Sequence, residues 1–127
     1  MTKEDVIRKY GSLSLADIGG AVYEIKVRKY LLDSGITVNG KMHKEAKKLV
    51  SAEGQAQAVE IILPLLTEQE EGVFRRGRNA KPHSHSKNAS IGAYHCATGF
   101  EALFGFLYLA EDTDRINELF TYIIEKI

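Results

Sequence analysis

The chain has 127 residues, a length that fits one domain over residues 1–127, and its formal net charge is zero. The proportions of hydrophobic (44%) and charged (27%) residues are ordinary for a soluble globular protein, and no apolar run approaches the roughly 18–20 residues of a membrane-spanning helix. Cys96 is the only cysteine, which excludes an intrachain disulfide and fits a reducing compartment, so a cytoplasmic location is expected.

The first predicted helix runs from Ser14 to about Asp33. Ser14 and Asp17 have the spacing of a capping box, and Gly35 follows as a stop. The apolar residues of this helix fall on one stripe at three- and four-residue spacing, which indicates the face turned to the core. They are Leu15, Ile18, Val22 and Ile25.

Apolar periodicity and terminal residues predict four further helices. They are expected over residues 42–66, 67–77, 90–110 and from 112 or 113 onward. Pro64 is expected to kink or end the first of them. Thr67 and Glu70 form a capping box for the next, and Gly77 is interpreted as its stop. No alternating strand pattern of useful length is present, so the predicted fold is all-α, a helical bundle.

A basic segment follows the helix predicted over 67–77. Between Gly72 and Phe100 there is no Asp or Glu, although the net charge of the whole chain is zero. The Arg and Lys residues of this segment are Arg75, Arg76, Arg78, Lys81 and Lys87. Arginine offers a planar fork that matches phosphate oxygens, so the segment is a candidate for nucleic-acid contact. The alternative is a solvated helix end whose cations complement the helix dipole.

Glu101 is the only charged residue in the strongly apolar stretch 97–107. Burying an unpaired carboxylate is very costly, so this group must reach water, a partner or a metal. Gly105 on the same helix, and Gly19 and Gly20 on the first helix, leave room for close packing of two backbones. We infer that these helices cross near Gly20 and Glu101. A glutamate that merely points to solvent is the alternative.

Four segments, taken together, resemble Mini-ribonuclease III, the short ribonuclease III family that lacks a separate double-stranded-RNA-binding domain. In chain order these are Leu15–Glu24, His43-Lys44 followed by 50–52 and 55–56, the basic run 75–81 with Lys87-Asn88, and Ala97–Leu103 with Gly105. The first segment, LADIGGAVYE, is similar to the family's common LAYIGDAVYE. The order and spacing of all four make the resemblance specific, and it covers nearly the whole chain.

The resemblance implies an all-α ribonuclease III fold, a symmetric homodimer, and Mg²⁺-dependent hydrolysis of double-stranded RNA. The implied natural substrate is the large-subunit ribosomal RNA precursor. Glu101 matches the second acidic ligand of the family, so it is expected to be catalytic and to bind the metal. The residues expected to contact RNA are Arg75, Arg76, Arg78, Asn79, Lys81, Lys87, Asn88, His43 and Lys44.

The first motif departs from the family at two positions. The catalytic Asp of the family falls on Gly20, which has no side chain to bind a metal, and its usual Tyr falls on Asp17. Asp17 lies within one helical turn of Gly20, so it is a candidate catalytic residue and metal ligand in place of the missing carboxylate. Otherwise it only caps the helix.

Three hypotheses follow from this departure. The first is an active nuclease that uses Glu101 and Asp17. The second is a catalytically impaired member or knockout that binds double-stranded RNA without cutting it. The third is a helical adaptor between proteins, which does not explain the acid-free basic segment.

Overall fold

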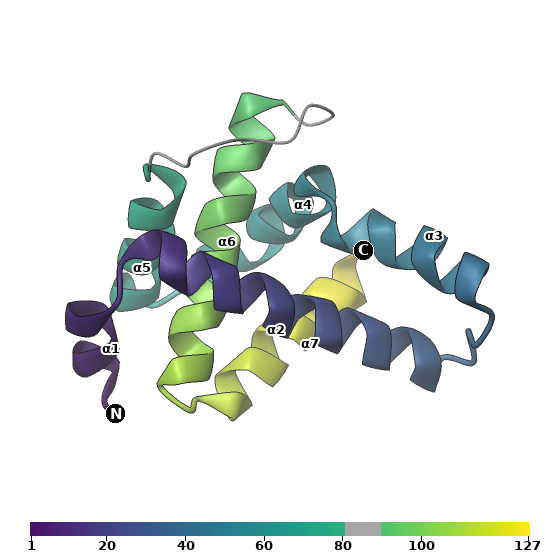
Figure 1. Ribbon diagram of the computed structural model, residues 1–127, viewed down its shortest axis with the longest axis horizontal. Helices are drawn as coiled ribbons and strands as arrows, with labels where there is room; N and C mark the ends of the chain where they lie inside the picture. Colours follow the sequence, from purple (N-terminus) through teal and green to yellow (C-terminus); the bar gives the residue numbers. More distant parts are fainter. Residues whose placement is uncertain (81–89) are drawn as a thin grey trace.

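The computed structural model describes residues 1–80 and 90–127, which form seven α-helices and one short 3₁₀ helix (Figure 1). The elements are α1 (Lys3–Lys9), α2 (Ser12–Asp33), α3 (Asn39–Val50), α4 (Ala52–Ile62), η1 (Leu63–Leu65), α5 (Glu68–Arg78), α6 (Ile91–Leu109) and α7 (Thr113–Lys126). These two ranges contain no strand, so the all-α prediction is confirmed. No helix within them is long and apolar enough to cross a membrane.

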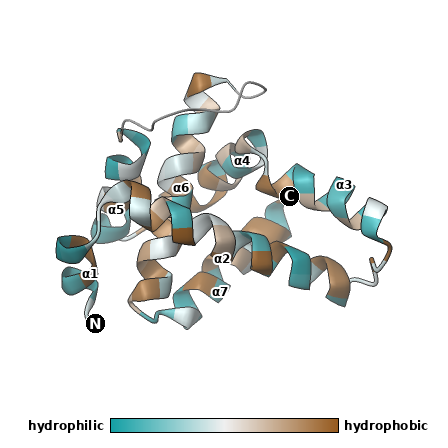
Figure 2. Ribbon diagram, viewed as in Figure 1, coloured by the Kyte–Doolittle hydropathy of each residue, from teal (hydrophilic) through white to brown (hydrophobic). Residues whose placement is uncertain are grey.

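Helix α6 forms the centre of the bundle, and α2, α4, α5 and α7 pack around it (Figure 1). The residues predicted to face inward from α6, which are Phe100, Leu103, Phe104 and Leu107, are all fully buried. Hydrophobic colour accordingly dominates the half of α6 that the other helices surround (Figure 2). From α2, Tyr23 places its ring edge-on against Phe100, with the ring centroids 4.7 Å apart. The core is therefore built mainly between α2 and α6.

The crossing of α2 and α6 depends on two glycines. A Cβ atom on Gly19 would lie 1.6 Å from the backbone oxygen of Glu101, and a Cβ on Gly105 would lie 1.9 Å from the backbone oxygen of Leu15. Only glycine permits backbones to approach this closely. The predicted crossing of these helices near Gly20 and Glu101 is confirmed.

The expected start of the first helix is wrong. Helix α2 begins at Ser12, and Gly11 is its N-cap without a side-chain capping bond. Ser14 therefore lies inside the helix and forms no capping box with Asp17. Ser14 is the third residue of α2, so it has the sequence spacing of a capping residue but does not stand at the start of the helix. The alternative that Asp17 only caps the helix is therefore wrong.

The expected apolar stripe of α2 is only partly correct. Leu15 is buried and Val22 is partly buried against the core, but Ile18 and Ile25 are 36% and 68% exposed. The helix buries a different face, which consists of Leu15, Ala16, Gly19, Tyr23, Val27 and Leu31. The helix has apolar residues on two faces, so periodicity alone did not identify the one that packs on α6.

The helix expected over residues 42–66 is divided in the structure. Ser51 adopts an extended conformation (φ −65°, ψ 163°) that ends α3, and its Oγ accepts a hydrogen bond from the N–H of Gly54 to begin α4. Serine is a favourable N-cap, and the sequence analysis missed this signal. Helix α4 ends at Ile62, immediately before the 3₁₀ turn that contains Pro64, so the predicted effect of the proline is confirmed.

Helix α5 begins as predicted and ends later than predicted. Thr67 and Glu70 form the expected capping box, but the helix continues through Gly77 to Arg78. Gly77 is buried, and a Cβ there would lie 2.8 Å from the Cβ of Ala102 on α6. This glycine therefore serves close packing and does not stop the helix.

The remaining helix ends include one that was not predicted. Asp112 caps α7, which was expected to begin at 112 or 113, and Ser90 caps α6, which was expected over residues 90–110. Helix α1 was not predicted, although Thr2 and Asp5 form a complete capping box at its start. Its seven residues are too few to show a clear apolar period.

A buried ion pair fastens α7 to α5 and η1. The Glu70 side chain is buried, and its two oxygens accept hydrogen bonds from Nε (2.9 Å) and Nη2 (2.8 Å) of Arg115. The same Nη2 also donates to the backbone oxygen of Leu65 at 2.8 Å. Two parallel N–H bonds to one carboxylate give a strong and directional contact, so this pair fixes the position of α7.

Candidate active site

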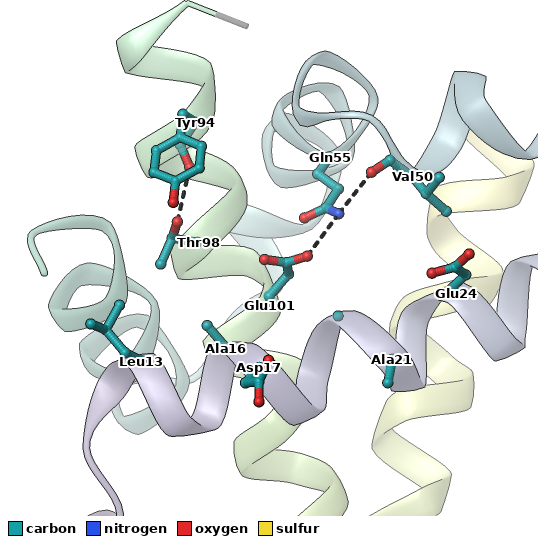
Figure 3. Close-up of a pocket in the computed structure, with 11 residues that line it drawn as sticks. Leu13, Ala16, Asp17, Ala21, Glu24, Val50, Gln55, Tyr94, Thr98 and Glu101 are labelled. Atoms are coloured by element: carbon teal, nitrogen blue, oxygen red, sulfur yellow. Dashed lines mark hydrogen bonds between the residues drawn. The ribbon is translucent and has the colours of Figure 1, made fainter. Parts of the chain in front are cut away.

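A pocket of about 450 Å³ opens where α2 and α6 cross near the junction of α3 and α4. Residues from all four helices line it: Leu13, Ala16, Asp17, Gly20, Ala21, Glu24, Val50, Gln55, Tyr94, Thr98 and Glu101. Both residues predicted to be catalytic, Asp17 and Glu101, are therefore in one pocket, together with Gly20. Figure 3 shows the Glu101 carboxylate extending from α6 toward Gln55, above the backbone of α2.

Glu101 is a largely buried carboxylate without a cationic partner. Among the described residues, its hydrogen-bond donor is Nε2 of Gln55, 3.2 Å from Oε2, and no ion pair includes it. Burial raises the pKa of Glu101 above its usual range; the Gln55 hydrogen bond opposes this rise, and the charge of Asp17 adds to it. The pocket is therefore a place where a cation would stabilise the ionised carboxylate.

Two positions one turn apart on α2, Asp17 and Gly20, line the pocket together with Glu101. Asp17 is exposed in the second turn of α2, and its charge reaches Glu101. Gly20 is one turn further on, and a Cβ atom built on it would lie 2.7 Å from Oε2 of Glu101. A side chain at position 20 would therefore project directly at the carboxylate of Glu101. Of these two positions, only Asp17 carries an acidic side chain.

A third carboxylate, Glu24, lines the same pocket and was not predicted. It lies one turn after Gly20, and spacings of three and four residues from Asp17 to Gly20 to Glu24 could have indicated a shared face of α2. Glu24 forms an ion pair with Arg28, whose Nη2 lies 2.8 Å from Oε1. Its charge is therefore already compensated, unlike that of Glu101.

Gln55 is the second functional candidate that the sequence analysis missed. It is one of the few buried polar side chains among the described residues, and it projects from the first turn of α4 to Glu101. Its position four residues before Val59 and seven before Ile62 places it on the apolar, inward face of α4. A glutamine on such a face was the available signal.

Helices α5 and α3, which each carry exposed basic and polar residues, lie on opposite sides of α6 (Figure 1). Arg75, Arg76, Arg78 and Asn79 are exposed at the C-terminal end of α5, and His43 and Lys44 are exposed on α3. Lys81, Lys87 and Asn88, which were also expected to bind RNA, lie outside the described residues. The set on α5 is close to the N-terminal half of α6, which carries Tyr94 and Thr98 into the pocket.

The arginines of α5 differ in how they are held. Arg75 pairs with Glu71 at 3.1 Å, and the Arg78 guanidinium lies 5.7 Å from the ring centroid of Phe74. Arg76 forms no ion pair within residues 1–80 and 90–127, and its guanidinium extends back along the helix toward Gly72. Arg75 is paired with a carboxylate and Arg78 lies against a ring, so Arg76 is the arginine of this helix whose guanidinium has neither contact among the described residues and can exchange water for a phosphate.

The sequence model of the family described as "Ribonuclease III domain" matches residues 13–112, most of the chain. The chain belongs to the ribonuclease III family. It is 42% identical over 122 residues to the Mini-ribonuclease 3 of Enterococcus faecalis, covering 94% of this chain and 92% of the relative. It is 46% identical over 107 residues to the Mini-ribonuclease 3 of Symbiobacterium thermophilum, covering 84% and 82%. The predicted Mini-ribonuclease III resemblance is thus confirmed, and the family is one of endoribonucleases.

A solved structure has the same fold as this ribonuclease III chain. A crystal structure of a protein from Fusobacterium nucleatum matches it with a TM-score of 0.87 and 28% sequence identity. The match covers 94% of this chain and 98% of the other. The ribonuclease III bundle predicted from the sequence is therefore the observed fold.

The acidic side chains of the pocket fit a magnesium ion that is bound partly by the protein and partly by water and substrate. Within the described ranges, no three His, Cys, Asp or Glu side chains gather closely enough to enclose a metal. Magnesium, however, usually keeps several waters and is bound by one or two carboxylates together with substrate phosphates. Glu101, a largely buried carboxylate without a cationic partner, and Asp17, an acid on the helix that crosses it, meet that requirement.

Proposed function

We propose that this chain is a magnesium-dependent endonuclease for double-stranded RNA, with Glu101 and Asp17 as its acidic groups. The observation that carries the proposal is the pocket at the crossing of α2 and α6. There the largely buried Glu101 side chain has no cationic partner among the described residues, and the charge of Asp17 raises its pKa further. Such a pair of acids is unfavourable alone and favourable around a divalent cation.

The roles of the side chains follow from their positions. A bound Mg²⁺ would lower the pKa of its water and stabilise negative charge on the phosphate. Glu101 and Asp17 would supply the anionic oxygens that hold it. The exposed basic groups on α5 and α3 would hold the phosphates of the duplex on the two sides of the pocket. A-form RNA presents phosphates and sugar hydroxyls across a wide, shallow minor groove, which a basic surface can recognise by shape.

We further propose a homodimer, in which two such pockets would cut the two strands. Support comes from the outer face of α2, where Ile18, Ile25 and Leu32 recur every seventh residue and are exposed. Residues at this spacing form one apolar stripe along a helix, which a second copy would cover. The Mini-ribonuclease III motifs make the large-subunit ribosomal RNA precursor the candidate natural substrate, and the cytoplasm the candidate location.

Cleavage of a long duplex RNA in the presence of Mg²⁺ tests this function. We expect the parent chain to cut, and Asp17→Asn to lower the rate about tenfold or more, because asparagine keeps the oxygen but loses the charge. RNA binding measured without divalent metal should be unchanged in this variant. A cleavage rate that is the same with and without the Asp17 carboxylate would exclude Asp17 as the second acid.

A specific observation also favours a second function, binding of double-stranded RNA without cutting. A Cβ at position 20 would lie 2.7 Å from Oε2 of Glu101, but this position is a glycine and has no side chain. In this case the parent would bind duplex RNA but not cleave it, and Gly20→Asp would create cleavage. Gly20→Asn, which has nearly the same size and no charge, is the matched control and should remain inactive.

The basic end of α5 gives a separate prediction. We expect Arg76→Ala to weaken duplex binding similarly for different RNA sequences and to reduce the slope of log K against log salt by about one, because one phosphate contact is lost. Filter binding at several salt concentrations measures this slope. Arg8→Ala, on α1, is the control and should leave the slope unchanged. Equal losses of thermal stability and binding in Arg76→Ala would contradict the assignment.

A further inference from the structure

We propose that Gln55 is a positioning residue, which fixes the Glu101 carboxylate in the pocket because the break between α3 and α4 fixes the Gln55 amide. The inference rests on the proposed function for its catalytic meaning. Its structural content concerns three groups: the backbone carbonyl of Val50, the amide of Gln55 and the carboxylate of Glu101 (Figure 3).

The break at Ser51 leaves a backbone carbonyl without its usual helical partner. In a continuous helix, the N–H of Gly54 would donate to the oxygen of Val50, four residues earlier. Here that N–H donates instead to Oγ of Ser51, at 3.1 Å. The carbonyl of Val50 accepts a hydrogen bond from Nε2 of Gln55, at 3.0 Å. The Gln55 side chain therefore takes the place that a backbone N–H has in an unbroken helix.

This bond determines which way the amide faces. A carbonyl oxygen only accepts hydrogen bonds, so the nitrogen of the Gln55 amide must face Val50. The same nitrogen has a second hydrogen, which is donated to Oε2 of Glu101 at 3.2 Å. Both hydrogens of one amide are thus committed, one to the backbone and one to the carboxylate.

The hydrogen bonds of the Gln55 amide are made by its nitrogen, because its oxygen has no partner among the described residues. Oε1 of Gln55 is buried and has no hydrogen-bond partner among the described residues. A buried acceptor without a donor destabilises the fold, and an apolar side chain of similar size would not carry that cost. The favourable contribution of Gln55 therefore lies in its two N–H bonds.

As a result, the two carboxylate oxygens of Glu101 have different surroundings. Oε2 is held by Gln55 on the side that faces the missing side chain of Gly20. Oε1 accepts no hydrogen bond from the described residues and is left for a ligand in the pocket. Without Gln55, χ1 and χ2 of Glu101 would be free to exchange among several staggered conformations, which would move the carboxylate within the pocket.

Gln55→Met tests the inference, because methionine keeps the length of the side chain and removes both donors. In the full-length protein we expect NMR three-bond couplings to report one Glu101 side-chain conformation in the parent and averaging over several in the variant. The matched control is Gln57→Met, on the exposed face of the same helix, which should leave Glu101 unchanged. A single, unchanged Glu101 conformation in Gln55→Met would overturn the proposal.

Cleavage kinetics supply the second readout. Loss of a group that orients a metal ligand typically lowers metal affinity or activity by about 10- to 100-fold. We expect kcat to fall by this factor in Gln55→Met while KM for the duplex stays constant. An unchanged kcat would overturn the positioning role. If the parent itself does not cleave, the proposed function fails, and the Glu101 couplings, which need neither RNA nor metal, still decide the role of Gln55.

Discussion

Replacing Gly19 with alanine is expected to destabilise the protein by about 3 kcal/mol or more, because the added methyl group would overlap the backbone of α6. The added Cβ would lie 1.6 Å from the backbone oxygen of Glu101 and 2.5 Å from the backbone nitrogen of Gly105. Both neighbours are backbone atoms inside a helix, so neither can move away without displacing α6. Thermal and urea unfolding measure the loss, which should lower the Tm by on the order of 10 °C.

Gly92→Ala is the matched control for this substitution. Gly92 is also in a helix, α6, but a Cβ there would meet nothing within 4 Å. Alanine is favoured over glycine in helices by up to about 1 kcal/mol, so this variant should be as stable as the parent or slightly more stable. Equal stabilities of Gly19→Ala and Gly92→Ala would mean that α2 and α6 are further apart than the structure places them.

Glu101→Gln is expected to lower Mg²⁺-dependent cleavage by about 10²- to 10³-fold, a typical effect of removing one group that stabilises charge in the transition state. The same change should raise stability at neutral pH without divalent metal. Burial, opposed by the Gln55 hydrogen bond and increased by Asp17, raises the pKa of Glu101, so its ionised form is unfavourable in the folded state. Single-turnover cleavage and thermal unfolding at pH 7.5 test the two parts.

The combination distinguishes this prediction from simple unfolding, because activity and stability move in opposite directions. Glu24→Gln is the control from the same pocket. Its carboxylate is paired with Arg28, so its loss should affect cleavage less and should not stabilise the protein. A Glu101→Gln variant that cleaves RNA at the parental rate, or that melts below the parent, would contradict the assignment.

The crossing at the pocket could be predicted because its cause is local in the sequence. Gly19, Gly20 and Gly105 interrupt helices that otherwise favour larger residues, and close packing is a common reason for helical glycines. The isolated charge of Glu101 in an apolar helix indicated a site for the same reason. These signals depend on residue type and spacing alone.

Other features required three-dimensional information. The outward stripe of Ile18 and Ile25 satisfies the helical period as well as the buried face does, so the sequence could not show which face meets α6. The role of Gln55 depends on a carbonyl released by the break at Ser51, and that break was not predicted. Glycine is a common helix stop, but Gly77 lies within α5, where it allows close packing against α6.

Mild acid should have opposite effects on stability through the carboxylates of Glu70 and Glu101. Burial tends to raise the pKa of Glu70, but the hydrogen bonds from Arg115 and Thr67 outweigh it and lower the pKa. Its contribution to stability is therefore complete above the unfolded-state pKa, near about 4.3, and is lost as the pH falls through the lower folded-state value. Glu101, whose pKa is raised, is protonated at a higher pH, and its protonation removes an unfavourable charge from the folded state.

Acid unfolding is therefore expected to start at the contact of α7 with α5, where protonation of Glu70 leaves the Arg115 guanidinium without its counter-ion. Amide hydrogen exchange at decreasing pH should show protection lost first in α7, while the amides of α2 and α6 beside the pocket remain protected. A contact between α7 and the first turn of α5, outside the pocket of Glu101, would then set the lower pH limit for folding of the whole chain.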